Sequence, residues 1–380
     1  MSFLMSSYAR LPISFVRGEG CRLFDDKGRE YLDALSGIAV CGLGHAHTEL
    51  NEVMREQSQA LWHVSNLFTV PEQERAGARL ASLMEMEKVY FCNSGAEANE
   101  AALKLARLHG KARGLTDGLV VSFKGSFHGR TFGAMSLTGN PKIQDGFAPL
   151  VPNIVQLPYN DKEALSALAG KRVVAVLLET IQGEGGVNPV TPEFLHYVRR
   201  FCDEQSALMM VDEIQTGMAR TGTFASYQGL GVMPDVVSMA KALGNGLPVG
   251  ATLARGAAAS YFQAGKHGST FGGTPLVCAV VDKVLEIYER DNLAERAKVQ
   301  GDKLREKLQS ALGHQVREIR GRGLMLGLEL LEKREGLMQR ALDVGLVMNV
   351  TAEKVIRLLP PLIINDAEIE ELVHKLTKIL

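Results

Sequence analysis

Lys241 has the position in this chain that most needs a chemical explanation. It follows the apolar run VVSMA and precedes the glycine-containing segment ALGNG. A lysine at the end of a strand can simply extend its ammonium group into solvent. Desolvation, however, lowers the pKa of a lysine amine from about 10.4, and the neutral amine can act as a covalent nucleophile in imine chemistry. We therefore treat Lys241 as a candidate catalytic residue.

Asp212 stands in a similar position, at the end of another apolar run in MMVDEIQTG. Such an aspartate can cap the helix that follows it. If it is buried instead, it requires a cationic partner or a proton. Glu213 follows it directly and is the second acidic residue at this strand end.

The segment FCNSGAEANE contains a candidate anion site. Ser94, Gly95 and Ala96 open a predicted helix, where small residues allow an anion to reach free backbone N–H groups. Ser94 and Glu97 also have the spacing of an ordinary capping box. The residues alone leave both interpretations open.

Two further loops carry side chains suited to binding a small molecule. In SFHGRTFGA, Phe127 offers a flat apolar face and Arg130 a fork-shaped cation, although both could be ordinary packing or solvated residues. In ETIQGEGG, Glu179 and Glu184 follow a strand and could belong to a simple turn.

One cofactor would use all of these loops together. Pyridoxal phosphate needs a lysine for imine formation, an acid beside its ring nitrogen, an anion site and a flat contact against its ring. Lys241, Asp212, the turn from Ser94 to Ala96 and Phe127 match these needs in turn. Their joint occurrence is much more specific than any one of the loops.

Composition excludes several other classes of protein. The net charge of -1 gives no general electrostatic reason to expect nucleic acid or a membrane as a partner. The five cysteines are far apart without a C-x-x-C pair, so we expect no disulfide framework and a reducing, cytoplasmic location. No third ligand is suitably spaced for His45 and His47, and we expect no metal. The segment GRGLMLG lacks the spacing of a dinucleotide loop.

Apolar runs alternate with helical stretches in the middle of the chain, which predicts an α/β fold with a mostly parallel sheet covered on both faces. The candidate residues then cluster, because ligands bind at the carboxyl ends of such strands. The predicted strands are residues 88–93, 118–123, 173–179, 207–213 and 235–240, and the clearest helices are 97–109 and 192–205.

The chain is long enough for two domains. We predict a large cofactor-binding domain at 51–275 and a smaller α+β domain formed by 1–50 and 276–380. The second part contains a long amphipathic helical region at 276–312, a strand-like segment at 321–331 and a closing helix.

Nearly the whole chain resembles the class III, or subgroup II, pyridoxal-phosphate aminotransferases. The segments that carry the resemblance are NSGAEANEAALKLAR, SFHGRTFGA, ETIQGEGG, VDEIQTGMARTG, AKALGNGLPVGA and HGSTFGGTPLVCA. It implies the fold-type I architecture and a homodimer with its active site at the subunit interface. The family usually has a glycine where this chain has Ala219, which puts the local loop geometry in doubt.

The resemblance also implies roles for individual residues. Lys241 would bind the cofactor covalently and shuttle the substrate proton, and Asp212 would pair with the ring nitrogen. Arg130, Ser269, Arg357 and Glu184 would bind substrate, with Glu184 masking Arg357 when no carboxylate needs it. The expected cofactor contacts are Ser94, Gly95, Ala96, Phe127, Asp212, Glu213, Ile214, Gln215, Lys241 and, from the other subunit, Thr270.

The implied reaction is the transfer of the δ-amino group of N-acetylornithine to 2-oxoglutarate. Succinylornithine, ornithine, 4-aminobutyrate and N-succinyl-diaminopimelate remain alternative donors. A glutamate-1-semialdehyde-type aminomutase would not need Arg357 and Glu184, and a non-catalytic dimer would not need Lys241, Asp212 and Arg130.

Overall fold

The computed structural model describes residues 3–380 of the chain. Its centre is a seven-stranded sheet with the order β4-β12-β11-β10-β7-β5-β6, in which β12 alone runs antiparallel to its neighbours. The strands are β4 (Lys88–Cys92), β5 (Leu119–Phe123), β6 (Ile154–Leu157), β7 (Val173–Glu179), β10 (Leu208–Asp212), β11 (Val236–Met239) and β12 (Gly250–Ala254). The predicted α/β class and all five predicted strands are confirmed.

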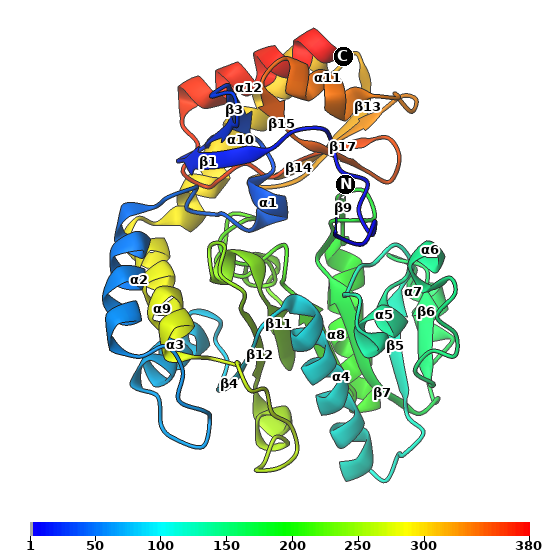
Figure 1. Ribbon diagram of the computed structural model, residues 1–380. Coiled ribbons are helices and arrows are strands. Elements are labelled where there is room, and N and C mark those ends of the chain that lie inside the picture. Colours follow the sequence, from blue (N-terminus) through cyan, green and yellow to red (C-terminus); the bar gives the residue numbers. More distant parts are fainter. Residues whose placement is uncertain (1–2) are drawn as a thin grey trace.

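Two helices show why the inner strands are apolar along their whole length. On one face, Leu208 and Met210 of β10 share a core with α4 (Gly95–Ala112). On the other face, Met209 and Val211 share a core with α8 (Pro192–Gln205). Side chains of a strand alternate between faces, so a doubly covered strand must be apolar at every position. Figure 1 shows the two helices along the sheet.

Two smaller sheets lie at the other end of the molecule (Figure 1). One contains β13 (Val316–Arg322), β14 (Met325–Leu330), β17 (Val355–Leu358) and β16 (Asn349–Thr351), in that order. The other joins β1 (Phe15–Glu19), β2 (Arg22–Asp25) and β3 (Glu30–Asp33) to β15 (Leu346–Val347). The parallel pairing of β3 with β15 supports our division of the chain, which remains a prediction.

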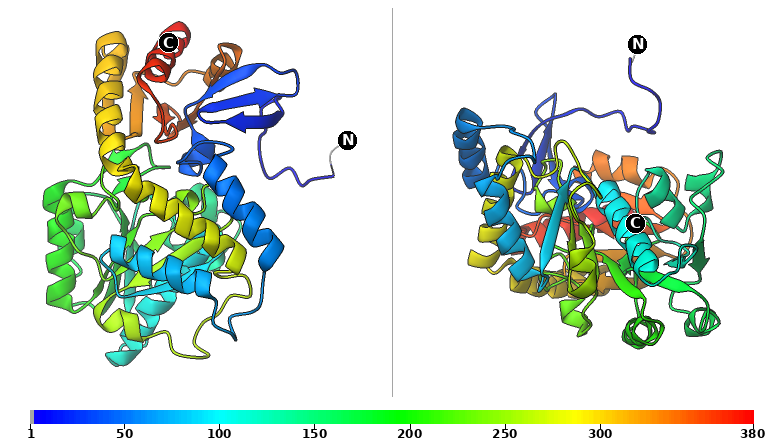
Figure 2. Two further views of the ribbon diagram at one scale, coloured as in Figure 1. Left: turned by 90° about the vertical axis from the view of Figure 1, so that its left-hand side faces the viewer. Right: turned by 90° about the horizontal axis from the view of Figure 1, so that it is seen from below.

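The predicted helical region at 276–312 is two helices, α9 (Pro275–Arg290) and α10 (Leu293–Leu312). They are separated at Asn292, whose φ of 46° interrupts a right-handed helix. α9 packs against α2 (Thr48–Ala60) and α3 (Pro71–Leu83), whereas α10 contacts the last helix, α12 (Asp366–Ile379), as Figure 2 shows. The segment 321–331 likewise holds the end of β13, a turn and β14.

Sequence did not predict β6 and β12. Gly250 at the start of β12 allows a close approach to the neighbouring loop, because a Cβ atom there would lie 2.3 Å from the carbonyl oxygen of Ser94. Within residues 3–380, none of the helices is both long and apolar enough to cross a membrane.

Candidate active site

The carboxyl ends of the parallel strands surround a cavity of about 410 Å³. The volume lies in the usual range for small-molecule and cofactor sites. Ten of the residues that we predict for the site line this cavity. They are Ser94, Gly95, Ala96, Phe127, Arg130, Glu184, Asp212, Ile214, Gln215 and Lys241.

Lys241 begins the short 3-10 turn η2 (Lys241–Leu243) directly after β11. Its φ is 51°, a left-handed conformation that costs a non-glycine residue about 1–3 kcal/mol. Burial lowers the pKa of the amine to about 8, with a further contribution from the positive charge of Arg357. Glu184, Asp212 and Glu179 act in the opposite direction. The amine is therefore poised to lose its proton near neutral pH.

Asp212 ends β10 and is held by three hydrogen-bond donors. Its Oδ2 accepts from the Asn99 amide and from Nδ1 of His128, each at 2.8 Å. Its Oδ1 accepts from the backbone N–H of Ile214 at 3.0 Å. His128 is itself buried, and its Nε2 has no hydrogen-bond partner among residues 3–380. These contacts fix the carboxylate in one orientation at the wall of the cavity.

The first turn of α4 faces the same cavity. The hydroxyl of Ser94 accepts from Glu97 N at 3.2 Å, so the capping interpretation of Ser94 is confirmed. The Glu97 carboxylate accepts from the N–H of Asn93 at 2.9 Å, one residue before the expected position of a capping box. Backbone N–H groups in the first turn of a helix lack acceptors within the helix. Gly95 and Ala96 therefore offer an anion site at the positive end of α4.

Phe127 lies on the cavity wall beside a buried acid. The backbone N–H of Phe127 donates to Oε2 of Glu179 at 3.1 Å, which fixes the loop that carries the ring. Burial and the charge of Asp212 raise the pKa of Glu179 well above its usual value. Arg130 is exposed, with its guanidinium carbon 5.7 Å from the centre of the Phe127 ring. A flat ring and a guanidinium group with the geometry to bind a carboxylate thus occupy neighbouring positions.

Arg357 reaches the site from β17 and is completely buried. Its Nη1 donates to Glu184 at 2.5 Å and to Gln215 at 3.1 Å, and its Nε donates to Asn349 at 3.3 Å. Its Nη2 has no hydrogen-bond partner among residues 3–380. The Glu184 side chain is 35% exposed, so it is the partner that can leave this pair.

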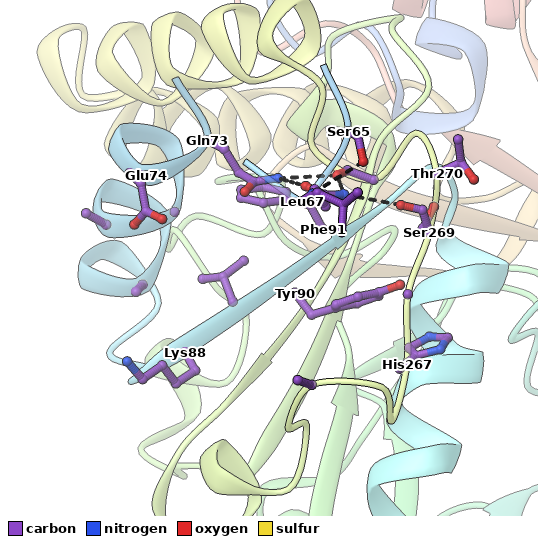
Figure 3. Close-up of a pocket in the computed structure, with 18 of the residues that line it drawn as sticks. Ser65, Leu67, Gln73, Glu74, Lys88, Tyr90, Phe91, His267, Ser269 and Thr270 are labelled. Carbon is purple, nitrogen blue, oxygen red and sulfur yellow. Dashed lines mark hydrogen bonds between the residues drawn. The ribbon is translucent and has the colours of Figure 1, made fainter. Parts of the chain in front are cut away.

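Besides Arg357, which contacts the lining residues Glu184 and Gln215, three predicted residues do not line this cavity. The Glu213 carboxylate turns into the protein, where it accepts from the Ser226 hydroxyl and from the Thr216 hydroxyl at 2.8 Å. Burial raises the pKa of Glu213 to about 7. Ser269 and Thr270 line a larger, open cavity of about 1120 Å³ (Figure 3). The Ser269 hydroxyl accepts a hydrogen bond at 3.0 Å from the side chain of Asn93, which lines the smaller cavity. This hydrogen bond connects the walls of the two cavities.

Our list of expected contacts omitted Asn99 and His128, and it gave no role to Glu179, which we had noted only as a strand-end acid. His128 follows Phe127 directly, and Asn99 is a buried amide on an otherwise apolar face of α4. A buried polar residue among alanines was the available signal for Asn99. Ala219 adopts a φ of 60°, which explains why glycine suits that position.

Comparison with known proteins decides the family. The model of the class III aminotransferases matches residues 4–380. This chain belongs to the class III aminotransferases. The chain is 47% identical to an acetylornithine aminotransferase of Nitrosomonas europaea, over 100% of this chain and 98% of the relative. It is 45% identical to one of Aquifex aeolicus, over 100% of both.

Solved structures give the same fold. An ornithine aminotransferase of Toxoplasma gondii superposes with a TM-score of 0.95 at 32% identity, covering 99% of this chain and 92% of that chain. An N-acetylornithine aminotransferase of Stenotrophomonas maltophilia gives 0.86 at 35% identity, covering 98% and 97%. Of these two structures, the ornithine aminotransferase has the higher TM-score, whereas the N-acetylornithine aminotransferase has the higher sequence identity to this chain. Backbone similarity reports the fold and not the choice of donor, so sequence identity carries more weight on that question.

Membership of the family makes pyridoxal phosphate the cofactor, and the cavity fits it. The amine of Lys241, the oriented carboxylate of Asp212 and the helix terminus at Gly95 and Ala96 all face one space. No cluster of side chains that could hold a metal occurs in the described chain, residues 3–380.

The effect of Arg357 on Lys241 can be tested in cofactor-free protein. Arg357→Gln should raise the pKa of the Lys241 amine, because the nearby positive charge that disfavours protonation is lost. The pH profile for acylation of Lys241, followed by mass spectrometry, should therefore move to higher pH. Arg317→Gln, which removes an exposed arginine, is the control. An unchanged profile in Arg357→Gln would contradict the electrostatic coupling.

Proposed function

We propose that this enzyme transfers the δ-amino group of N2-acetyl-L-ornithine to 2-oxoglutarate in arginine biosynthesis. The products are N-acetyl-L-glutamate 5-semialdehyde and L-glutamate. The single observation that carries the proposal is the buried Arg357 with its removable partner Glu184. The names of relatives at 43–47% identity over the full chain support acetylornithine as the donor. Ornithine is the second candidate, because the Toxoplasma gondii structure bears that name.

The side chains of the cavity divide the chemistry among them. Pyridoxal phosphate, when bound, supplies the electron sink that makes removal of a proton beside the amine possible. Asp212 would keep the ring nitrogen protonated, since its position is fixed by Asn99 and His128. The Lys241 Nζ, with its lowered pKa, would take the proton from the substrate carbon and return it. The N–H groups of Gly95 and Ala96 would hold the phosphate.

Arg357 and Glu184 would let one pocket accept two different donors. Glutamate loses its amine beside a carboxylate, and the guanidinium with its free Nη2 can bind that group. Acetylornithine loses a terminal amine with no anion nearby, so an uncovered guanidinium would be left buried and unpaired. Glu184 would cover it in that half-reaction. Arg130 and Ser269 would bind the remote end of the substrate.

A panel of amino donors tests the proposed substrate. With 2-oxoglutarate as acceptor, kcat/KM for N2-acetylornithine should exceed that for ornithine and 4-aminobutyrate by roughly tenfold or more. Kinetics should be ping-pong, and Lys241→Ala should be inactive with every donor. A preference for ornithine over its acetylated form would replace the proposal with the second candidate.

Glu184→Gln tests the proposed role of the acid in half-reactions followed separately by single-turnover spectroscopy. The acetylornithine half-reaction should slow by about tenfold or more, the scale of one hydrogen bond to a charged group, and the glutamate half-reaction should change little. Glu353→Gln, an exposed acid on the loop before β17, is the control. Equal losses in the two half-reactions would argue against the role.

We also propose that the enzyme is a homodimer with Thr270 reaching the cofactor phosphate of the other subunit. Thr270 is exposed and does not line the cavity of its own chain that contains Lys241. Near it is a group of exposed apolar side chains, and the rings of His63 and Phe271 lie 5.4 Å apart. These side chains are Leu61, Trp62, Leu67, Phe68 and Phe271. Exposed apolar patches of this kind are typical of protein interfaces.

Leu67→Asp should break the dimer. Leu67 is 87% exposed in the single chain and would be covered by the other subunit in the dimer, so the substitution would bury a charge in the interface. Sedimentation should show monomers that lose the cofactor on gel filtration. Leu331→Asp, at an exposed leucine after β14, should leave the dimer intact. A fully active wild-type monomer would contradict the proposal.

We further propose a cytoplasmic location. All five cysteines are free thiols and four of them are buried, as suits a reducing compartment.

A further inference from the structure

The loop that carries Glu184 is attached to the sheet that carries Arg357. It joins β8 (Ile181–Gln182) to β9 (Asn188–Pro189), which pair as a short antiparallel ribbon. From β16, the Thr351 hydroxyl donates to the backbone carbonyl of Glu184 at 2.6 Å. From β13, Arg320 donates to the carbonyls of the next turn. Its Nε lies 3.1 Å from the oxygens of Gly186 and Val187, and its Nη2 lies 2.7 Å from that of Gly186.

The two residues whose carbonyl oxygens Arg320 binds both have a positive φ. Gly186 has a φ of 113° and Val187 a φ of 56°. A β-branched residue in the left-handed region is disfavoured by its own side chain, and such conformations persist only where the surroundings hold them. Val187 is fully buried, and Arg320 donates hydrogen bonds to its carbonyl oxygen and to that of Gly186. The Arg320 guanidinium therefore helps to stabilise this backbone conformation of Val187.

Arg320 is itself fixed by an acid of the next strand. Its Nη1 donates to Glu329 at 2.5 Å, and Lys354 lies 2.8 Å from the same carboxylate. Hydrogen bonds from Lys354 and Arg320 lower the pKa of Glu329 to about 2, so the carboxylate is ionised at neutral pH. With Nη1 held in this way, Nε and Nη2 point at the loop. A lysine could not make these contacts together, because its ammonium is a point charge and not a planar fork.

We propose that Arg320 is a positioning residue for Glu184. It keeps the loop in the conformation from which Glu184 reaches Arg357, and so favours donors whose reacting amine has no carboxylate beside it. This rests on the proposed function, in which Glu184 covers Arg357 for such donors. Arg320 touches neither substrate nor cofactor in this arrangement. Its effect should therefore appear in the choice between donors more than in the chemistry common to both.

Arg320→Lys tests the proposal in the cofactor-loaded enzyme. Losing the fork should lower the rate constant of the acetylornithine half-reaction by about tenfold, a typical cost of misplaced groups, and change the glutamate half-reaction less than about threefold. Hydrogen exchange of residues 183–188 should become faster in the absence of substrate. Arg317→Lys is the matched control, since Arg317 lies on the same strand and pairs with the same Glu329 but is exposed. It should change neither measurement.

Combining Arg320→Lys with Glu184→Gln separates this inference from the proposed function. The quantity to compare is the rate constant of the acetylornithine half-reaction divided by that of the glutamate half-reaction. If Arg320 acts through Glu184, the effect of Arg320→Lys on this ratio disappears in the double variant. A ratio effect that persists there would overturn the positioning role, as would faster loop exchange with an unchanged ratio. An unchanged ratio in Glu184→Gln alone would overturn the role of Glu184 itself. If Arg320→Lys does not fold, Thr351→Val can be used instead, because it removes the hydrogen bond from Thr351 to the Glu184 carbonyl. It should shift the ratio of the two half-reaction rate constants in the same direction.

Discussion

The parallel register of β7, β10 and β11 decides where the charged groups of the site stand. Asp212 pairs in register with Glu179 on one side and with Ser238 on the other. Two carboxylates therefore lie at one level at the carboxyl ends of the strands, and Lys241 follows two residues after the end of the third strand, β11. A slip of one residue in any of these strands would send its side chain to the opposite face of the sheet. The relative positions of these side chains therefore depend on the register.

The same edge brings charges together that would be costly to bury one at a time. Asp212 is stabilised by three donors, whereas Glu179 has an increased proton affinity and Lys241 a decreased one. Arg357 has an acidic partner, Glu184, that can leave. Burial thus has three outcomes here: a carboxyl group fixed by three donors, groups whose pKa is displaced, and a guanidinium with an exchangeable partner. Each outcome corresponds to a different task in an enzyme that alternates between two substrates.

Sequence reasoning could find the strands and the loops after them, because fully buried parallel strands are apolar throughout and their polar ends stand out. It could not find β12, whose sequence GATLA is short and begins with Gly250, where the backbone closely approaches the Ser94 loop. It also omitted Asn99 and His128, because a second layer of hydrogen bonds has no spacing signature. The orientation of Glu213 could not be deduced either, since Asp212 and Glu213 are adjacent acidic residues at the end of the same strand. Only the strand geometry separates a residue that faces the cavity from one that faces Ser226.

The attachment of the Glu184 loop to the small sheet has a mechanical consequence. Arg357, Thr351 and Arg320 lie on three strands of one four-stranded sheet, so the guanidinium and the loop that covers it are fixed to the same body. The loop also continues from the large sheet, because β8 begins two residues after β7 ends. It therefore spans the two parts of the molecule, and a shift of the small sheet against the large one would pull directly on the loop that carries Glu184.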